Sequence, residues 1–312
     1  MIGSGWAARL RLSGVAVRAF DPSPNTSSGL ADTHDQALLS WRELGVAPGD
    51  DAVGSLRVCR SIGDACDGVE LAIESVSERL DLKHAILTEI DGAADPSTVV
   101  ASSTSGFRPS VLAAPFARPE RFIVAHPFNP VYLLPLVEVV AGERTDETVV
   151  ERALDVFRSI GMHPLRVRAE VDAHIADRLL EAMWREALWL VNDGVATTAE
   201  IDDAIRFGFG LRWAQMGVFE TYRTAGGDGG MRHFLAQFGE HLRSPWTRLV
   251  DVPELTDELV DTVVRQSDEQ SGARGVRELE RIRDRNLVGI LLALEANDWG
   301  AGRVTAEMRR RG

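Results

Sequence analysis

The chain has 312 residues, of which 45% are hydrophobic, and its formal net charge is -13 at pH 7. This length and apolar content predict two domains, each with its own core. The negative charge repels phosphate backbones, which argues against a nucleic acid partner. No apolar stretch reaches the roughly 20 residues that a membrane span requires, and the first residues lack the pattern of a signal peptide. We therefore expect a cytoplasmic protein with no membrane partner.

The cysteines argue against a structural metal or a disulfide framework. The chain has two of them, Cys59 and Cys66, and no pair of histidines is spaced to complete a zinc site with them. Secreted domains that depend on disulfides carry many more cysteines than this. The sequence therefore predicts no metal.

The first residues resemble the end of a glycine-rich dinucleotide-binding loop. The intact loop, G-x-G-x-x-G, follows a strand and opens a helix, and its glycines bring the backbone close to a pyrophosphate. Within residues 1–9, Gly3 fits the third glycine of this loop. We therefore expect a truncated N-terminus that lacks the first strand and two glycines, with Ile2, Gly3 and Ser4 as cofactor contacts. A small-residue turn before a helix is the alternative interpretation.

A β-branched run, residues 15–20, predicts the next strand, and Asp21 follows it. A carboxylate at this position accepts hydrogen bonds from the ribose hydroxyls of NAD and repels the extra phosphate of NADP. The sequence therefore predicts NAD as the cofactor, with Asp21 as a ligand. The truncated start is expected to weaken NAD binding, because few of the backbone amides that cradle the pyrophosphate remain.

Short β-branched runs alternate with amphipathic segments up to residue 168. The strand candidates are residues 15–20, 56–59, 69–73, 98–102, 122–125, 136–140 and 165–167. Segments 80–93 and 147–160 have the pattern of crossover helices on a mainly parallel sheet. Residues 1–168 are therefore predicted to form a Rossmann-type α/β domain, with a doubly wound sheet whose first strand is missing.

After residue 168 the pattern changes to helical periodicity. Segments 177–192, 198–207 and 274–296 carry apolar residues at helical spacing. We therefore expect residues 169–312 to form an all-helical domain, which binds the substrate and joins two copies of the chain in a homodimer.

Three motifs carry a resemblance to a known family. They are Ser102-Ser103-Thr104-Ser105-Gly106, His126-Pro127-Phe128-Asn129-Pro130 and Pro135-Leu136-Val137-Glu138-Val139-Val140. In this order they resemble the Ser-x-Thr-Ser turn, the His-x-x-Asn-Pro turn and the Val-Glu-Val strand of the 3-hydroxyacyl-CoA dehydrogenase superfamily. The resemblance covers essentially the whole chain, and it implies NAD-dependent oxidation of a secondary alcohol.

The motifs contain the residue types that this reaction needs. A base must take the hydroxyl proton, and histidine is suited to that role, so we expect His126 to be the general base. Glu138 is a lone charge in an apolar strand and needs a partner. We expect it to orient the imidazole and to stabilise the protonated ring, while Ser105 hydrogen-bonds the substrate oxygen. A histidine that caps a turn is the alternative interpretation of His126.

The resemblance also implies that Glu78 and Lys83 contact the nicotinamide-ribose half of the cofactor. In the family, the acidic turn and the helix start that contain them lie under this part of the cofactor. A solvated helix start, capped by Asp81, explains the same pattern without a cofactor.

The second domain departs from the family at its first long helix. Many relatives have Asn-Arg there, and the amide donates to the substrate, whereas this chain has Asp177-Arg178. An ionised aspartate cannot donate a hydrogen bond. Asp177 is nevertheless expected to be a catalytic residue at this position. Aromatic faces with a nearby carboxylate bind quaternary ammonium groups, so we also expect Asp177 and Trp213 to bind a cationic substrate. Packing in the core or in a dimer is the alternative for the aromatic residue.

Within the superfamily, the residues of these motifs resemble those of the carnitine dehydrogenases. This implies oxidation of the 3-hydroxyl of L-carnitine to 3-dehydrocarnitine, with carnitine or another 3-hydroxy acid as the small-molecule substrate. Three other interpretations stay open at this point. They are a 3-hydroxybutyryl-CoA or L-gulonate dehydrogenase, a non-enzymatic dimer like the lens crystallins of the superfamily, and a flavin-binding or sensor module.

Overall fold

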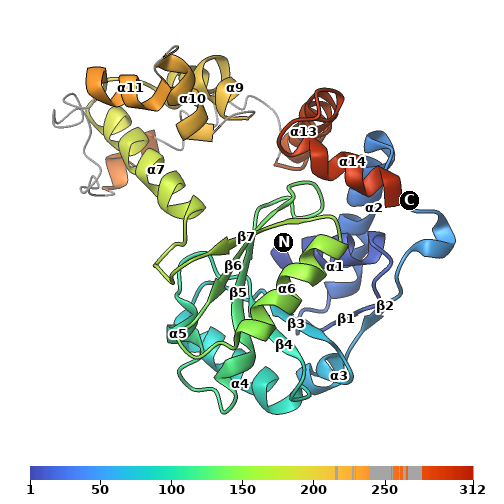
Figure 1. Cartoon of the computed structure of the whole chain (residues 1–312). Helices are drawn as coiled ribbons and strands as arrows, with labels where there is room; N and C mark the ends of the chain where they lie inside the picture. The colour runs from blue at the N-terminus through green and yellow to red at the C-terminus, as the bar shows by residue number, and fades with distance from the viewer. Residues whose placement is uncertain are drawn as a thin grey trace. The chain divides into compact units, whose positions relative to one another are not determined.

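The computed structural model divides the chain into two compact units (Figure 1). One unit comprises Met1–Arg178 and Asp284–Gly312, and the other comprises Leu179–Arg283. The structure describes residues 1–214, 217–226, 228, 230–238, 254, 256–259, 261–262, 265 and 276–311. The predicted domain boundary at residue 168 stays a prediction. The units differ from it in two respects, because the first unit extends to Arg178 and the C-terminal segment packs with it.

The strands of the first unit form two sheets. β1 (Val17–Ala19) pairs in parallel with β2 (Leu56–Val58), and the second sheet has the order β3-β4-β5-β6-β7. The strands of the second sheet are β3 (Leu71–Glu74), β4 (Val99–Ser102), β5 (Phe122–Pro127), β6 (Leu136–Ala141) and β7 (His163–Val167). Its neighbours run parallel except for β5 and β6, which are antiparallel. The prediction of a mainly parallel α/β sheet is confirmed, and all seven predicted strands are present.

Helices cover both faces of the five-stranded sheet (Figure 1). The helical segments of the first unit before residue 178 are α1 (Ile2–Leu12), α2 (Thr26–Leu44), η1 (Asp50–Ala52), α3 (Ile62–Cys66), α4 (Leu80–Ala93), α5 (Pro109–Leu112), η2 (Pro119–Arg121) and α6 (Glu147–Ser159). Successive strand residues point to opposite faces of a sheet. Ala101 and Ile123 therefore pack in one cluster with residues of α1 and α6. Val100 and Val124 pack in another cluster with residues of α3, α4 and α5.

The end of the chain returns to the first unit. α13 (Val276–Ala296) and α14 (Gly302–Arg311) follow the second unit in sequence. Val288 and Leu291 of α13 are buried against Trp41 and Tyr132. The Tyr132 hydroxyl also donates a 2.6 Å hydrogen bond to the buried carboxylate of Asp284. These contacts explain why residues 284–311 belong to the unit that carries the sheet.

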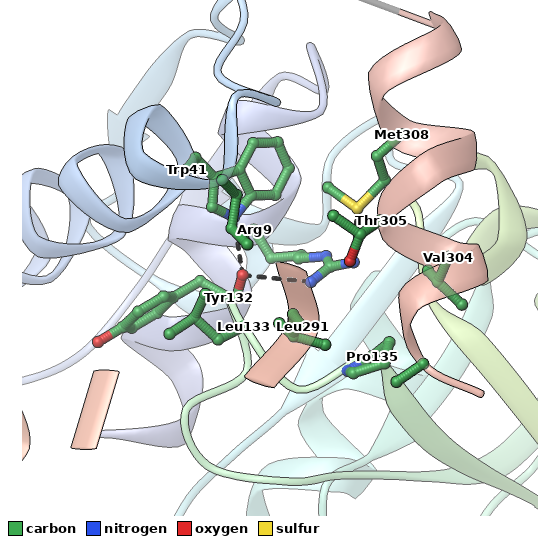
Figure 2. A pocket seen from close by; sticks show the side chains of 11 residues that line it. Arg9, Trp41, Tyr132, Leu133, Pro135, Leu291, Val304, Thr305 and Met308 are labelled. Atoms are coloured by element: carbon green, nitrogen blue, oxygen red, sulfur yellow. Dashed lines mark hydrogen bonds between the residues drawn. The ribbon is translucent and has the colours of Figure 1, made fainter. Parts of the chain in front are cut away.

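A buried arginine ties these parts of the first unit together. Arg9 lies in a small pocket beside α14, and both it and Trp41 donate to the carbonyl oxygen of Tyr132, at 3.2 and 2.7 Å (Figure 2). Arg9 also donates to the carbonyls of Ile160 and Gly161, just after α6. Burial lowers the pKa of Arg9 to about 9. Its donors are used by backbone carbonyls, so Arg9 joins α1 to the chain that follows α6.

The second unit is helical in the part that the structure describes. α7 (Ala176–Asn192) leads into it, and the helices that follow are α8 (Thr198–Ala204), the π-helical turn η3 (Ile205–Phe209), α9 (Gly210–Trp213), α10 (Gly217–Ala225) and α11 (Gly230–Phe238). A capping box fixes the start of α8, since Thr197 accepts from the amide of Glu200 and Glu200 accepts from the amide of Thr197. The predicted all-helical character of this part is confirmed.

None of the helices in the described ranges is long and apolar enough to cross a membrane. Cys59 and Cys66 are free thiols, and both are buried. Burial raises the pKa of each thiol above its ordinary value. These groups therefore stay protonated at neutral pH and act as small apolar side chains.

Candidate functional site

Polar residues, among them the predicted base His126, lie where neighbouring strands of the five-stranded sheet end. Glu74 is the last residue of β3, Ser102 is the last residue of β4, and His126 is close to the end of β5. Since β3, β4 and β5 run parallel, their carboxyl ends meet at one edge of the sheet. Open α/β sheets bind their ligands at this edge.

His126 and Glu138 form a buried pair across two strands. The antiparallel register of β5 and β6 places the two residues opposite each other. The Nδ1 atom of His126 donates to Oε2 of Glu138 at 2.9 Å. Glu138 is fully buried, and His126 is 4% exposed. The contact fixes one imidazole tautomer, because a carboxylate only accepts, and it leaves Nε2 as the basic nitrogen.

The other oxygen of Glu138 is held by the start of α7. Its Oε1 atom accepts hydrogen bonds from the backbone amides of Ile175 at 3.0 Å and Ala176 at 3.1 Å. Burial raises the pKa of the Glu138 carboxyl, but the hydrogen bonds from His126 and the two amides outweigh burial and leave the pKa below its ordinary value. Glu138 is therefore a carboxylate at neutral pH, anchored on both oxygens.

Asp177 lies beside the free nitrogen of His126. Its Oδ2 atom is 3.7 Å from Nε2, and its side chain is 24% exposed. The residue belongs to the first turn of α7, where the partial positive charge of the helix favours a carboxylate. The structure thus brings together three of the four predicted catalytic residues, with a carboxylate near each ring nitrogen of His126.

Ser105, the fourth predicted catalytic residue, lies in the turn after β4. It is exposed. The turn is fixed by Glu78, whose Oε1 atom accepts from the Gly106 amide at 3.0 Å and from the Thr104 hydroxyl. Burial raises the pKa of Glu78, but the Thr104 and Gly106 hydrogen bonds and nearby Lys83 leave the pKa below its ordinary value. Glu78 therefore positions the turn that presents Ser105.

Lys83 is buried in α4 and uses its ammonium inside the protein. Its Nζ atom lies 3.0 and 3.3 Å from the two carboxylate oxygens of Glu74, 3.2 Å from the Val76 carbonyl and 3.3 Å from Glu78. The side chain is 1% exposed. Ser102 donates to Glu74 as well, at 2.5 Å. The predicted direct contacts of Glu78 and Lys83 with the cofactor stay predictions, and the geometry gives both residues a part in holding the loops at the sheet edge.

The remaining predicted cofactor residues lie at the start of α1 and after β1. Ile2, Gly3 and Ser4 form the first turn of α1, which has no side-chain cap. Asp21 follows β1 and is exposed, with Oδ1 accepting from the Ser23 amide at 2.8 Å. In NAD-binding domains, backbone amides at a helix start donate to the pyrophosphate, and a carboxylate after the strand that follows this helix accepts from the ribose hydroxyls.

Trp213 belongs to the second unit. It ends α9 and packs against Phe209, with ring centroids 4.6 Å apart. Its predicted role in binding a cation stays a prediction.

A second histidine at the site was not predicted. His174 is fully buried, and its ring centroid is 5.6 Å from that of His126. It precedes α7 by two residues, in a segment with no motif and no regular periodicity. The one sequence signal was its position three residues before Asp177, which alone does not distinguish it from a surface histidine.

Both halves of the chain match models of a known protein family. Residues 1–171 match the 3-hydroxyacyl-CoA dehydrogenase NAD binding domain, and residues 174–266 match the 3-hydroxyacyl-CoA dehydrogenase C-terminal domain. The chain belongs to the 3-hydroxyacyl-CoA dehydrogenase family. Membership in this family of NAD-dependent oxidoreductases confirms the predicted class of enzyme and NAD as its cofactor.

Curated relatives within the 3-hydroxyacyl-CoA dehydrogenase family narrow the comparison. The L-carnitine dehydrogenase of Pseudomonas aeruginosa is 53% identical over 98% of this chain and 95% of its own length. The L-carnitine dehydrogenase/betainyl-CoA thioesterase of Agrobacterium fabrum is 57% identical over 100% of this chain. The chain spans 63% of the length of that protein, and 62% of its counterpart from Ruegeria pomeroyi.

A solved structure extends the similarity to the fold. The crystal structure of 5-formyl-3-hydroxy-2-methylpyridine 4-carboxylic acid 5-dehydrogenase, described as an NAD+ dependent dismutase, is 30% identical with a TM-score of 0.78. The match covers 94% of this chain and 95% of that one. The prediction of a Rossmann-type domain followed by a helical domain is thereby confirmed.

Proposed function

We propose that this chain oxidises the 3-hydroxyl of L-carnitine with NAD and releases 3-dehydrocarnitine. The relatives named L-carnitine dehydrogenase, which are 50 to 57% identical, support this substrate. In the structure, the surroundings of His126 support the proposal. Glu138 binds one ring nitrogen at 2.9 Å, and the carboxylate of Asp177 lies 3.7 Å from the other.

His126 acts as the general base in this reaction. Its Nε2 atom takes the hydroxyl proton of the substrate while Nδ1 stays bonded to Glu138. The carboxylate of Glu138 stabilises the imidazolium that results, and the two amides that hold Glu138 prevent it from turning away. Ser105, at the tip of the turn after β4, donates to the same substrate oxygen and keeps the hydroxyl directed at His126.

The residues at the sheet edge suit NAD. The first turn of α1 offers free backbone amides for the pyrophosphate, and Asp21 offers a carboxylate for the ribose hydroxyls. When bound, NAD supplies the acceptor for the two electrons and the hydrogen that leave the substrate carbon. The network of Lys83 and Glu78 holds the loops after β3 and β4 beside it.

Asp177 selects the charge of the substrate. In L-carnitine the trimethylammonium nitrogen is two bonds from the carbon that is oxidised, a separation of about 2.5 Å. A carboxylate close to the nitrogen that receives the hydroxyl proton therefore lies close to this cation as well. The same carboxylate does not donate a hydrogen bond to an acyl carbonyl, which disfavours neutral 3-hydroxyacyl esters.

Substrate comparison tests the proposed function. The purified protein is assayed with NAD and L-carnitine, 3-hydroxybutyrate, 3-hydroxybutyryl-CoA or L-gulonate, and NADH formation is recorded. We expect L-carnitine to have the highest kcat/KM, and we expect replacement of His126 by Gln to lower its kcat by about 100- to 10,000-fold. A higher kcat/KM for the CoA ester or for gulonate would move the chain to another branch of its family.

We also propose that two copies of the chain associate. Leu179, Leu180 and Trp184 of α7 are 59, 53 and 56% exposed, and Phe207 and Phe219 are 78 and 80% exposed. Leu180 and Trp184 are four residues apart and so lie on one face of α7, and a contiguous exposed apolar patch is typical of a surface that another chain covers. Light scattering on a sizing column measures the mass, and a monomer would refute this proposal.

The predicted cytoplasmic location stays a prediction, to be tested by cell fractionation.

A further inference from the structure

His174 is a fully buried histidine that takes no part in the proposed proton transfer. It has φ 52°, and Ala173 before it has φ 60°. Two successive residues other than glycine in the left-handed region are rare, and such strain persists only where the surrounding structure holds it. The chain therefore adopts an unfavourable backbone to bring this imidazole inside.

The hydrogen bonds of the ring define its tautomer. Nε2 lies 3.3 Å from the carbonyl oxygen of Thr104, and a carbonyl only accepts, so Nε2 carries the proton. Nδ1 has no hydrogen-bond partner among the described residues. Burial lowers the pKa of His174, and the neighbouring His126 lowers it further. His174 is thus neutral at neutral pH, and the substrate proton goes to His126.

The position of His174 connects two parts of the site. On one side, the Ala173 amide donates to the Gly106 carbonyl at 3.0 Å, and His174 donates to Thr104, so both hold the turn of Ser105. On the other side, the next two amides, those of Ile175 and Ala176, hold Glu138. Segment 173–176 therefore contacts the Ser105 turn and the His126–Glu138 pair at once.

Packing alone does not account for a histidine here. A fully buried imidazole with one unpaired nitrogen is costlier than a phenylalanine of similar size, which leaves no polar atom unpaired. The group that distinguishes histidine from phenylalanine at this place is the Nε2–H donor to Thr104.

We propose that His174 is a positioning residue: its Nε2–H bond to Thr104 sets the distance between Ser105 and the His126–Glu138 pair. This inference rests on the proposed function, in which both parts act on one substrate oxygen. Misplacement of a reacting group by about 1 Å costs up to about 100-fold in rate. Loss of the bond is therefore expected to lower kcat far more than it changes the KM for NAD.

Three replacements of His174 distinguish the role of Nε2 from that of Nδ1. In His174→Gln the amide nitrogen falls near the position of Nε2 and restores the donor to Thr104. In His174→Asn the amide falls near Nδ1 instead, and His174→Phe keeps the ring without either nitrogen. His84→Phe is the matched control, because His84 also has Nε2 2.9 Å from a backbone carbonyl, that of Val111 in α5.

The kinetic test compares kcat and KM for NAD and L-carnitine in the four variants. We expect His174→Gln to stay within about threefold of the natural protein, and His174→Asn and His174→Phe to lose about 10- to 100-fold in kcat. His84→Phe should keep its kcat. The proposal is overturned if His174→Phe is as active as the natural protein, if Gln is as poor as Phe, or if Asn rescues and Gln does not.

A second measurement needs no substrate. Amide hydrogen exchange over residues 173–178 should be faster in His174→Phe than in the natural protein and unchanged in His174→Gln. Equal exchange in both variants would overturn the proposal. If the natural protein does not oxidise carnitine but the two variants show the expected exchange rates, the proposed function is refuted and this role of His174 stands.

Discussion

Replacement of Asp177 by Asn tests whether this carboxylate recognises the cation of the substrate. Oδ2 of Asp177 is 3.7 Å from Nε2 of His126, and a hydroxyl that gives its proton to Nε2 lies about 2.8 Å from it. The ammonium nitrogen of L-carnitine lies about 3 to 4 Å from that hydroxyl oxygen, given ordinary bond lengths. With the ammonium directed toward Asp177, the carboxylate and the cation come to about 5 Å from each other in the complex.

The distance sets the expected size of the effect. Two unit charges about 5 Å apart attract by about 3 kcal/mol at an effective dielectric constant of about 20. The Asp177 side chain is 24% exposed, so water screens the pair, and we expect about 2 kcal/mol. This corresponds to about a 30-fold loss of kcat/KM for L-carnitine in Asp177→Asn.

A neutral substrate of the same shape separates charge from all other effects. In 3-hydroxy-5,5-dimethylhexanoate a carbon atom replaces the ammonium nitrogen of carnitine. We expect Asp177→Asn to change kcat/KM for this compound by less than about threefold, because no charge pair is lost. An equal loss for both compounds would mean that Asp177 acts on His126 or on the start of α7, and the recognition of the cation would be refuted.

The remaining predictions concern the base, the cofactor, the aromatic residue and acid stability. His126→Gln should lower kcat by about 100- to 10,000-fold and leave NAD affinity, measured by titration calorimetry, unchanged; a variant with half of the natural rate would sink the assignment. Asp21→Ala should narrow the preference for NAD over NADP, measured as the ratio of kcat/KM, and an unchanged ratio would remove its role at the ribose. Trp213→Leu should raise the KM for L-carnitine several-fold more than that for its neutral isostere, whereas equal changes would assign Trp213 to packing. The pKa of Glu138 is lowered in the folded chain, so its contribution to stability is complete above about pH 4.3 and is lost as pH falls through the folded-state pKa. Denaturant unfolding at several pH values should therefore show a weaker acid dependence in Glu138→Gln, and identical slopes would contradict this.

The pairing of His126 with Glu138 was predictable because it depends on local pattern. A lone carboxylate in an apolar strand needs a partner, and the motif order places the histidine at the end of the preceding strand. The antiparallel register then brings the two side chains face to face. The same reasoning found all seven strands, since alternation of β-branched runs and amphipathic helices is written in the sequence itself.

The burial of polar side chains and the contacts between segments far apart in the sequence were not predictable in the same way. Lys83 has the sequence context of a surface lysine, and its burial follows from Glu74 at the end of β3, nine residues earlier. The conformation of His174 opposes its intrinsic preference and is held by contacts with residues 104 and 106, about 70 positions away. The apolar stripe of α13 predicts that something covers it, but the pattern does not name Trp41 and Tyr132 as the partners.

The return of the C-terminal helices means that the first unit is not one continuous stretch of sequence, because residues 179–283 separate its two parts. A fragment that ends at residue 178 would keep the sheet and the His126–Glu138 pair, yet it would bare Trp41 and Tyr132 to water and remove the carboxylate that binds the tyrosine hydroxyl. Tyr132 is six residues after His126, the proposed general base. We therefore expect mutations in α13 to disturb the segment beside the proposed catalytic histidine. We also expect that exchange of the helical region between relatives requires the final helices to stay with the sheet against which they pack.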